Sequence, residues 1–170
     1  MSDYTISMLL FVLAIIISAN IIINNFPINP VFEELKTDAS KISEILLSEG
    51  YPSDWHNESV IRPGLLTANR LNKTKVINAM NMSYSLLKPK LQALHNFIVI
   101  FEDPGSDMIE FDGLCVIGSP DISINSTGSG PLTDCHNPDF TSITYNNMLR
   151  ITRLIIYESQ IIRMVVYVWE

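Results

Sequence analysis

The stretch Met8–Ile23, MLLFVLAIIISANIII, decides the architecture of this chain. It lies within a longer segment, Tyr4 to Phe32, in which no side chain is charged. A helix rises about 1.5 Å per residue, so the roughly twenty residues from Tyr4 to Ile23 match a hydrocarbon core of about 30 Å. The sequence therefore predicts an N-terminal transmembrane helix, residues 1–26, followed by a separate head domain, residues 27–170.

A cleaved secretory signal and a buried core helix are the alternatives for this segment. A secretory signal carries a basic region before its apolar core and a small-residue cleavage site after it. Met1 to Ser7 contains no Lys or Arg, and Ala19 is followed by Asn20 and three isoleucines. Core helices of soluble domains are usually shorter and interrupted by polar residues. These features favour a retained anchor in contact with membrane lipid.

Cys115 and Cys135 bracket a segment rich in turn-forming residues, GSPDISINSTGSGPLTD. A disulfide closing a loop of this length contributes about 3 kcal/mol in the chain-entropy model. Two unrelated buried thiols are the alternative. Disulfides persist in oxidising compartments, so a bridge fits an exported domain.

Four Asn-x-Ser/Thr sequons make Asn57, Asn72, Asn81 and Asn125 candidate glycosylation sites. Together with the cysteine pair they indicate a single-pass protein of the cell membrane whose C-terminal domain lies outside. Lys36 and Lys41, the first basic residues after the anchor, favour the opposite orientation. We expect the external orientation.

The charge of the chain limits the classes of partner that the sequence predicts. The net charge is −7, and no Lys/Arg-rich run occurs anywhere in the chain. The electrostatic footprint of a nucleic-acid-binding protein is therefore missing. An acidic surface of this kind mainly favours solubility.

An amphipathic helix is predicted from Val31 to Glu49. Asn29 suits its N-cap, Pro30 its first position and Gly50 its C-cap. Its apolar side chains recur three and four residues apart, at Phe32, Leu35, Ala39, Ile42 and Leu46. Such a stripe packs on the sheet of its own domain, or it serves helix–helix assembly, which makes it a candidate assembly stripe.

Two short helices are expected in the middle of the chain. Residues 51–71 are loop-like, and Asn72 caps a helix over Lys73–Met80. A second helix starts near Ser83 and is kinked or ended by Pro89.

Strands dominate the remainder. They are predicted at Asn96–Phe101, Met108–Ile117, Leu149–Tyr157 and Ile161–Trp169. The second of them has a candidate break at Asp112–Gly113. The fold class is therefore α+β: a hydrophobic transmembrane helix, an amphipathic helix, and an antiparallel β-sheet head that ends in a β-hairpin.

The hairpin loop determines which side chains share a face. A three-residue connection, residues 158–160, sets Leu154 opposite Met164 and gives one wholly apolar face, whereas a two-residue loop sets Leu154 opposite Arg163. We therefore predict three residues, although no glycine is present for the usual left-handed position. The predicted helix covers one face of the sheet. The other is half apolar, so something covers it too.

Candidate chemical groups are few. The densest carboxylate cluster consists of Asp103, Asp107, Glu110 and Asp112. Its glycine and acidic residues are not spaced as in a calcium-binding loop, so we interpret it as a solvated turn. The histidines His56, His95 and His136 do not stand at metal-ligand spacing. We predict no metal site and no cofactor.

Motifs of catalysis are also missing from the sequence. It contains no nucleophile elbow, phosphate-binding glycine loop or dinucleotide fingerprint. Ser129, between Gly128 and Gly130, lies in a linker-like stretch, which is the wrong context for a strained nucleophile. Trp55 and Trp169 suit a core or an interface. We expect no catalytic residue and no enzymatic activity.

Three stretches carry a resemblance to a known family: FEELKTDASKISEILLSEGYPSDW, RLNKTKV and the terminal ITRLIIYESQIIRMVVYVWE. Together with the hydrophobic N-terminal helix they resemble archaeal type IV pilin-like proteins, small surface proteins with class III signal peptides. The resemblance covers most of the chain. It implies an N-terminal helix that sits in the membrane before packing into a filament core, an external β-rich head and no enzymatic activity. It also implies that the head lies at the cell surface or in a pilus.

The interruption at Asn24–Pro30 favours a minor pilin-like subunit over a bulk pilin, whose N-terminal helix would be continuous. The partners implied are other pilin-like subunits, contacted through the N-terminal helix. An anchored accessory subunit of a cell-envelope complex that forms no filament is the alternative. An exported hydrolase is a third possibility, which predicts a pocket with convergent titratable groups.

Overall fold

The computed structural model describes residues 2–25, 30–118, 135 and 144–170. The chain divides into two compact units, residues 1–33 and 34–170. The division falls between Glu33 and Glu34, within the second helix.

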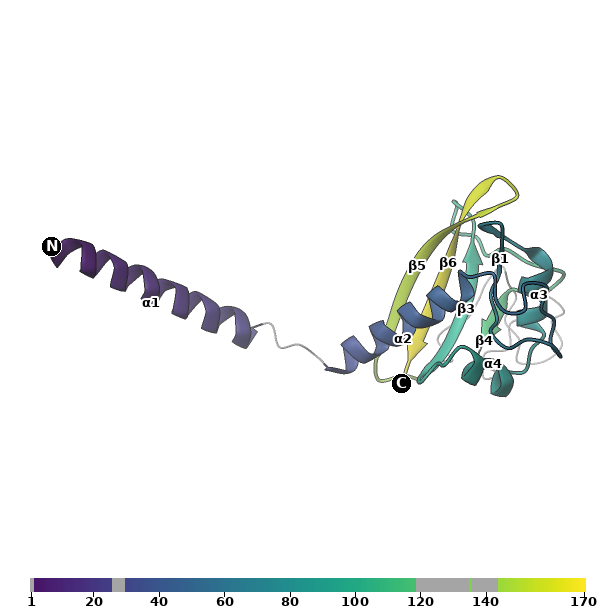
Figure 1. The fold of residues 1–170 in the computed structure, drawn as a ribbon, viewed down its shortest axis with the longest axis horizontal. Coiled ribbons are helices and arrows are strands. Elements are labelled where there is room, and N and C mark those ends of the chain that lie inside the picture. Colours follow the sequence, from purple (N-terminus) through teal and green to yellow (C-terminus); the bar gives the residue numbers. More distant parts are fainter. Residues whose placement is uncertain (1, 26–29, 119–134, 136–143) are drawn as a thin grey trace. The chain divides into compact units, whose positions relative to one another are not determined.

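The first unit is dominated by one long helix, α1 (Ser2–Asn25), drawn in purple in Figure 1. No glycine or proline interrupts these residues, and their apolar side chains surround the whole helix rather than one face. From Tyr4 to Ile21 every side chain is exposed. Helix α1 therefore forms without a protein core to bury it.

Helix α2 (Pro30–Leu46) begins at the predicted proline and ends three residues before the predicted Glu49. Its buried apolar side chains all belong to the predicted stripe: Leu35, Ala39, Ile42 and Leu46. Phe32, the fifth member, is half exposed and lies on the other side of the unit boundary. The predicted N-cap, Asn29, lies outside the described residues.

The head contains a four-stranded antiparallel sheet. Its strands are β3 (Asn96–Glu102), β4 (Val116–Gly118), β5 (Met148–Tyr157) and β6 (Gln160–Trp169), in the order β4-β3-β6-β5. The predicted α+β class with a C-terminal hairpin is thereby confirmed. The predicted strand Met108–Ile117 is interrupted at its candidate break, because Asp112 and Gly113 both have positive φ. Before the break Met108 forms an isolated bridge with Glu102, and the paired strand β4 begins at Val116.

The three-residue hairpin loop was wrong. Tyr157 pairs with Gln160, so only Glu158 and Ser159 connect β5 to β6, and Leu154 faces Arg163. Both loop residues have positive φ, as a type I′ turn requires. This turn matches the right-handed twist of the strands, and that preference outweighed both the missing glycine and the gain of one wholly apolar face.

Helix α2 covers one face of the sheet, as Figure 1 shows. The buried side chains on this face alternate along three strands: Phe97, Val99, Phe101, Leu149, Ile155, Ile162, Met164, Val166 and Val168. A polar contact joins the two layers where Arg153 Nε donates to Ser43 Oγ at 3.3 Å. The main core of the head therefore lies between α2 and the sheet.

The disulfide Cys115–Cys135 covers part of the opposite face. Both cysteines are buried, their Cα atoms lie 6.0 Å apart, and they form one cluster with Ile98 and Trp169. Partly buried side chains complete this cluster: Met108, Val116, Met148 and Tyr167. The predicted bridge is thus present, and it covers part of the sheet face that was expected to be covered.

Smaller elements close the head. Helix α3 (Lys73–Met80) starts at the predicted cap, where Lys75 N donates to Asn72 Oδ1 at 3.2 Å. Helix α4 (Tyr84–Lys90) includes Pro89 near its C-terminal end. Strands β1 (Leu66–Thr67) and β2 (Arg70–Leu71) form a small hairpin that was predicted as loop.

A close backbone crossing holds the loop that contains Trp55. A Cβ atom added to Gly64 would lie 2.2 Å from Gly50 N, so only glycine fits. The indole Nε1 of Trp55 donates to Gly64 O at 2.7 Å. Trp55 is consequently a buried core residue, as predicted.

Candidate functional site

Helix α1 is the first candidate for function. Its segment Tyr4–Ile21 has a mean hydropathy of 2.2, which makes it the one helix among the described residues that is long and apolar enough to cross a membrane. A signal sequence near an N-terminus has the same properties. Asn20 is the strongly polar residue of the segment, and its Nδ2 donates to Ile16 O at 3.1 Å. This bond reduces the cost of placing an amide in hydrocarbon.

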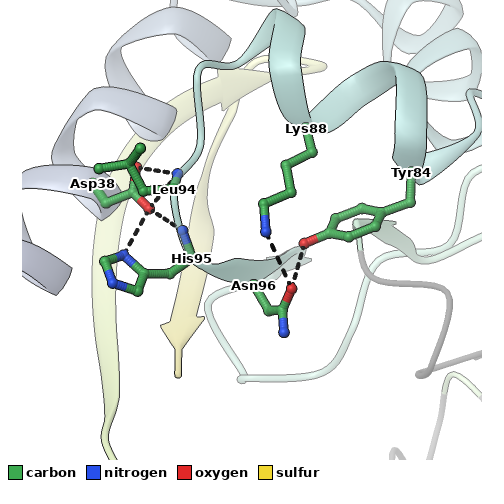
Figure 2. A network of polar contacts seen from close by, with 6 residues as sticks. All are labelled: Asp38, Tyr84, Lys88, Leu94, His95 and Asn96. Atoms are coloured by element: carbon green, nitrogen blue, oxygen red, sulfur yellow. Dashed lines mark hydrogen bonds and ion pairs between the residues drawn. The ribbon is translucent and has the colours of Figure 1, made fainter.

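A buried carboxylate connects α2 to the start of β3 (Figure 2). Asp38 is 2% exposed and accepts hydrogen bonds from the backbone nitrogens of Leu94, at 3.0 Å, and His95, at 2.8 Å. The ring nitrogen Nδ1 of His95 lies 3.1 Å from the same carboxylate. We name Asp38, Leu94 and His95 the Asp38 network.

A second polar group lies next to it (Figure 2). The hydroxyl of Tyr84 donates to Asn96 Oδ1 at 3.1 Å, and Lys88 Nζ donates to the same oxygen at 3.3 Å. Lys88 Nζ also lies 5.8 Å from the centre of the Tyr84 ring. These contacts attach α4 to the first residue of β3, while the Asp38 network attaches α2 just before it. Both are structural junctions.

The Asp38 network resembles half of a catalytic triad, in which a buried carboxylate orients a histidine. Such a pair needs a nucleophile within hydrogen-bond reach of the second ring nitrogen. No hydroxyl or thiol contact to that nitrogen is found among the described residues. The hydrogen bonds from the backbone nitrogens of Leu94 and His95 give Asp38 a positioning role in the fold.

A buried charged group lies at the other end of β3. Oε1 of Glu102 lies 3.2 Å from Arg150 Nη2, and Oε2 of Glu102 lies 3.4 Å from Arg163 Nε. Arg163 also donates to Asp103 O and to Ser106 Oγ, at 2.9 and 2.8 Å. Arg163 thereby fixes the loop that follows β3.

Lys75 is buried and bonded to two backbone carbonyls. Its Nζ donates to Glu49 O at 2.8 Å and to Leu66 O at 2.7 Å. Burial lowers the pKa of the ammonium below its ordinary value, although the charges of Glu49 and Asp54 oppose this effect. Through these two hydrogen bonds Lys75 connects the segment that follows α2 to the small hairpin of β1 and β2.

The described sequons differ in their surroundings. Asn72 caps α3 and donates to Thr67 Oγ1, and Asn81 Nδ2 donates to Ile77 O at 3.0 Å. Asn57 is exposed in a turn next to His56, whose Nδ1 lies 3.1 Å from Ser59 Oγ. Asn125 lies outside the described residues. Asn57 is thus the described sequon whose amide carries no capping or hydrogen-bonding role.

The predicted acidic cluster is a tight turn. Asp107 N donates to Asp103 Oδ1 at 2.9 Å, and Ser106 N donates to Asp103 O at 3.1 Å. Asp112 is engaged elsewhere, because its Oδ1 lies 2.7 Å from Lys73 Nζ. Glu110 is exposed. Within the described part of the chain, no three His, Cys, Asp or Glu side chains are grouped so that they could hold a metal ion.

The structure does not bring the three histidines together. His56 belongs to an exposed turn and His95 to the Asp38 network, while His136 lies outside the described residues. The glycine-flanked Ser129 also lies outside them. Trp169 is buried against the disulfide.

Apolar side chains are exposed at the tip of the C-terminal hairpin. Leu154 is 70% exposed, Ile161 is 61% exposed, and Ile156 pairs with Ile161 across the strands. A hollow of about 320 Å³ reaches from this tip to Leu47 and Leu66. The exposure follows from the two-residue turn, which places Leu154 and Ile156 on the face away from α2.

Another hollow, of about 470 Å³, lies beside α4. It is lined by Tyr51, Ile61, Arg62, Lys90 and Gln92. Tyr51 and Ile61 are among the most exposed large apolar side chains of the head. Lys90 Nζ is held at this site by donation to Val60 O. We name it the Tyr51 hollow.

The Asp38 network was not predicted, because Leu94 and His95 lie 56 and 57 residues from Asp38 along the chain. A faint signal existed, since Asp38 directly precedes the apolar Ala39 on the side of the helix that was expected to be buried. A carboxylate there requires a buried donor.

Comparisons with protein-family models, with curated proteins and with solved structures find no match for this chain.

Proposed function

We propose that this protein is a membrane-anchored, non-enzymatic surface protein of the pilin-like kind, a minor subunit that acts through assembly and through binding by its head. The observation that supports this proposal most directly concerns helix α1. Its apolar side chains surround the helix and are exposed throughout Tyr4–Ile21. Exposed apolar surface of this extent is unfavourable in water and favourable in lipid.

The disulfide supports an external head. Bonds of this type form and persist in oxidising compartments, and the bridge between Cys115 and Cys135 covers part of the core. The exposed sequon at Asn57 agrees with the same location.

One observation favours the alternative, an accessory subunit of an envelope complex that forms no filament. Four members of the candidate assembly stripe, Leu35, Ala39, Ile42 and Leu46, are buried within the head. Only Phe32 remains half exposed, so α2 offers little surface for helix–helix assembly. Assembly would then depend on α1 and on the outer surface of the head.

Electron microscopy and alkaline-carbonate extraction of membranes test the two versions. Retention of the chain in carbonate-washed membranes supports the anchor. Filaments that bear the chain along their length favour the pilin-like subunit, whereas a discrete membrane complex favours the accessory subunit. Release of the intact chain by carbonate would contradict both.

A further inference from the structure

We infer that the Tyr51 hollow of one head is a docking site for the Asp103–Asp107 turn of a second copy of this chain. This inference deepens the proposed function and rests on it, because it requires heads held next to one another by membrane anchors.

The Tyr51 hollow combines exposed apolar surface with positive charge. Tyr51 and Ile61 provide the apolar part, and Arg62 and Lys90 provide two cations. None of the ion pairs between described residues includes either cation. On a chain with a net charge of −7, these unneutralised cations attract an acidic partner.

The Asp103–Asp107 turn has the complementary properties. Residues 104–107 are exposed, and the carboxylate of Asp107 is likewise outside every ion pair between described residues. The turn is rigid, because its two aspartates bond across it and Arg163 holds both Asp103 O and Ser106 Oγ. A preorganised turn loses little conformational entropy on docking.

The two surfaces cannot meet within one molecule. Gln92 and Lys90 precede β3, whereas Asp103 and Asp107 follow it, so the seven residues of this strand separate them. At about 3.3 Å per residue the separation along the strand is about 20 Å. The partner of each surface is therefore on another copy.

Because the two surfaces differ, the contact is heterologous, and a joined pair of heads keeps one unused hollow and one unused turn. Such contacts propagate into rings or open chains. A single turn in a single hollow buries less area than a stable interface in solution needs. Anchoring two heads in one membrane raises their effective concentration and compensates for this weakness.

Zero-length carbodiimide cross-linking of the full-length protein in lipid vesicles tests the contact. The reagent joins an amine to a carboxylate, and a mixture of isotope-labelled and unlabelled protein identifies links between copies by mass spectrometry. We expect a link from Lys90 to Asp107 or Asp103, with a yield that falls at high salt. Vesicles in which other lysines are linked but Lys90 is not would overturn the inference.

Charge reversal sharpens this experiment. Lys90→Glu and Asp107→Lys, each alone, should lower the yield of dimers about ten-fold, and the double variant should restore it by joining the same two positions in reverse. Arg62→Glu should also lower the yield. Arg70→Glu, an equal charge change at an exposed position outside the hollow, is the matched control and should leave it unchanged.

Circular dichroism of every variant shows whether the head still folds. A folded double variant without restored cross-linking would overturn the contact. Carbonate extraction separates this result from the proposed function: a chain that stays in the membrane without the link contradicts only the head contact, whereas a chain that leaves the membrane contradicts the anchor.

Discussion

Asp38 and His95 are joined twice. One carboxylate oxygen of Asp38 lies 2.8 Å from the backbone nitrogen of His95 and 3.1 Å from its ring nitrogen Nδ1. The other oxygen lies 3.2 Å from the backbone nitrogen of Leu94. These contacts occur where α2 passes the beginning of β3, so one buried side chain sets the position of the helix on the sheet.

Substitution Asp38→Asn tests this role. The amide cannot accept hydrogen bonds through its nitrogen, so at least one buried donor loses its partner, and the free energy of unfolding should fall by about 1–3 kcal/mol. Urea unfolding of the full-length protein in detergent, followed by near-ultraviolet circular dichroism, measures it. The exposed Asp54→Asn is the control. Equal stability of the two variants would contradict the role of Asp38.

The hairpin turn should accept a more favourable sequence. Glu158 and Ser159 have φ values of 47° and 69°, which Asn and Gly adopt with less strain. The double change Glu158→Asn/Ser159→Gly should raise the free energy of unfolding by about 1 kcal/mol. Ser159→Ala keeps a Cβ atom at the same positive φ, so it should give no such gain. If the double variant is no more stable than the wild type, the two-residue turn is not the one in solution.

Removal of the disulfide should destabilise the head and expose Trp169. The bridge closes a loop with a sequence separation of 20 residues, and Cys115→Ala/Cys135→Ala should lower the free energy of unfolding by about 3 kcal/mol. Because both sulfurs pack in the cluster with Trp169, its fluorescence should shift to the red and become easier to quench with acrylamide. Unchanged quenching in the folded variant would show that other residues cover the indole.

Alkaline pH should reveal the environment of Tyr167. Burial raises the pKa of its phenol above the ordinary value of 10.0, although Arg150 opposes this. A group with a raised folded pKa stabilises the fold fully below the unfolded value and loses that contribution as pH rises through the folded one. Tyr167→Phe should therefore lose less stability above pH 10 than the wild type, which parallel urea titrations measure. If the free energy of unfolding falls equally with pH in both proteins above pH 10, the prediction is contradicted.

Local patterns made much of the fold predictable. The apolar run of α1, the stripe of α2 and the cap at Asn72 all depend on residues close in sequence. The cysteine pair was also predictable, because the turn-rich segment between them needs a covalent constraint. These features decide the fold class without knowledge of long-range contacts.

The errors had two different causes. The hairpin register was wrong because the two-residue turn and the strand twist outweighed the apolar pattern of β5. The Asp38 network was missed because its donors lie in another part of the chain. The candidate assembly stripe remained ambiguous, since a periodic apolar pattern predicts burial but does not name the surface that buries it.

The proposed function depends above all on where the head lies, and digestion of intact cells with a membrane-impermeant protease measures this most directly. Antibodies against the C-terminal hairpin would follow the head, with cytoplasmic proteins as controls. We expect the head to be digested while the controls survive. Survival of the head on cells stripped of any outer layer, with digestion only after lysis, would contradict an external head and would make Lys36 and Lys41 the correct guide to orientation.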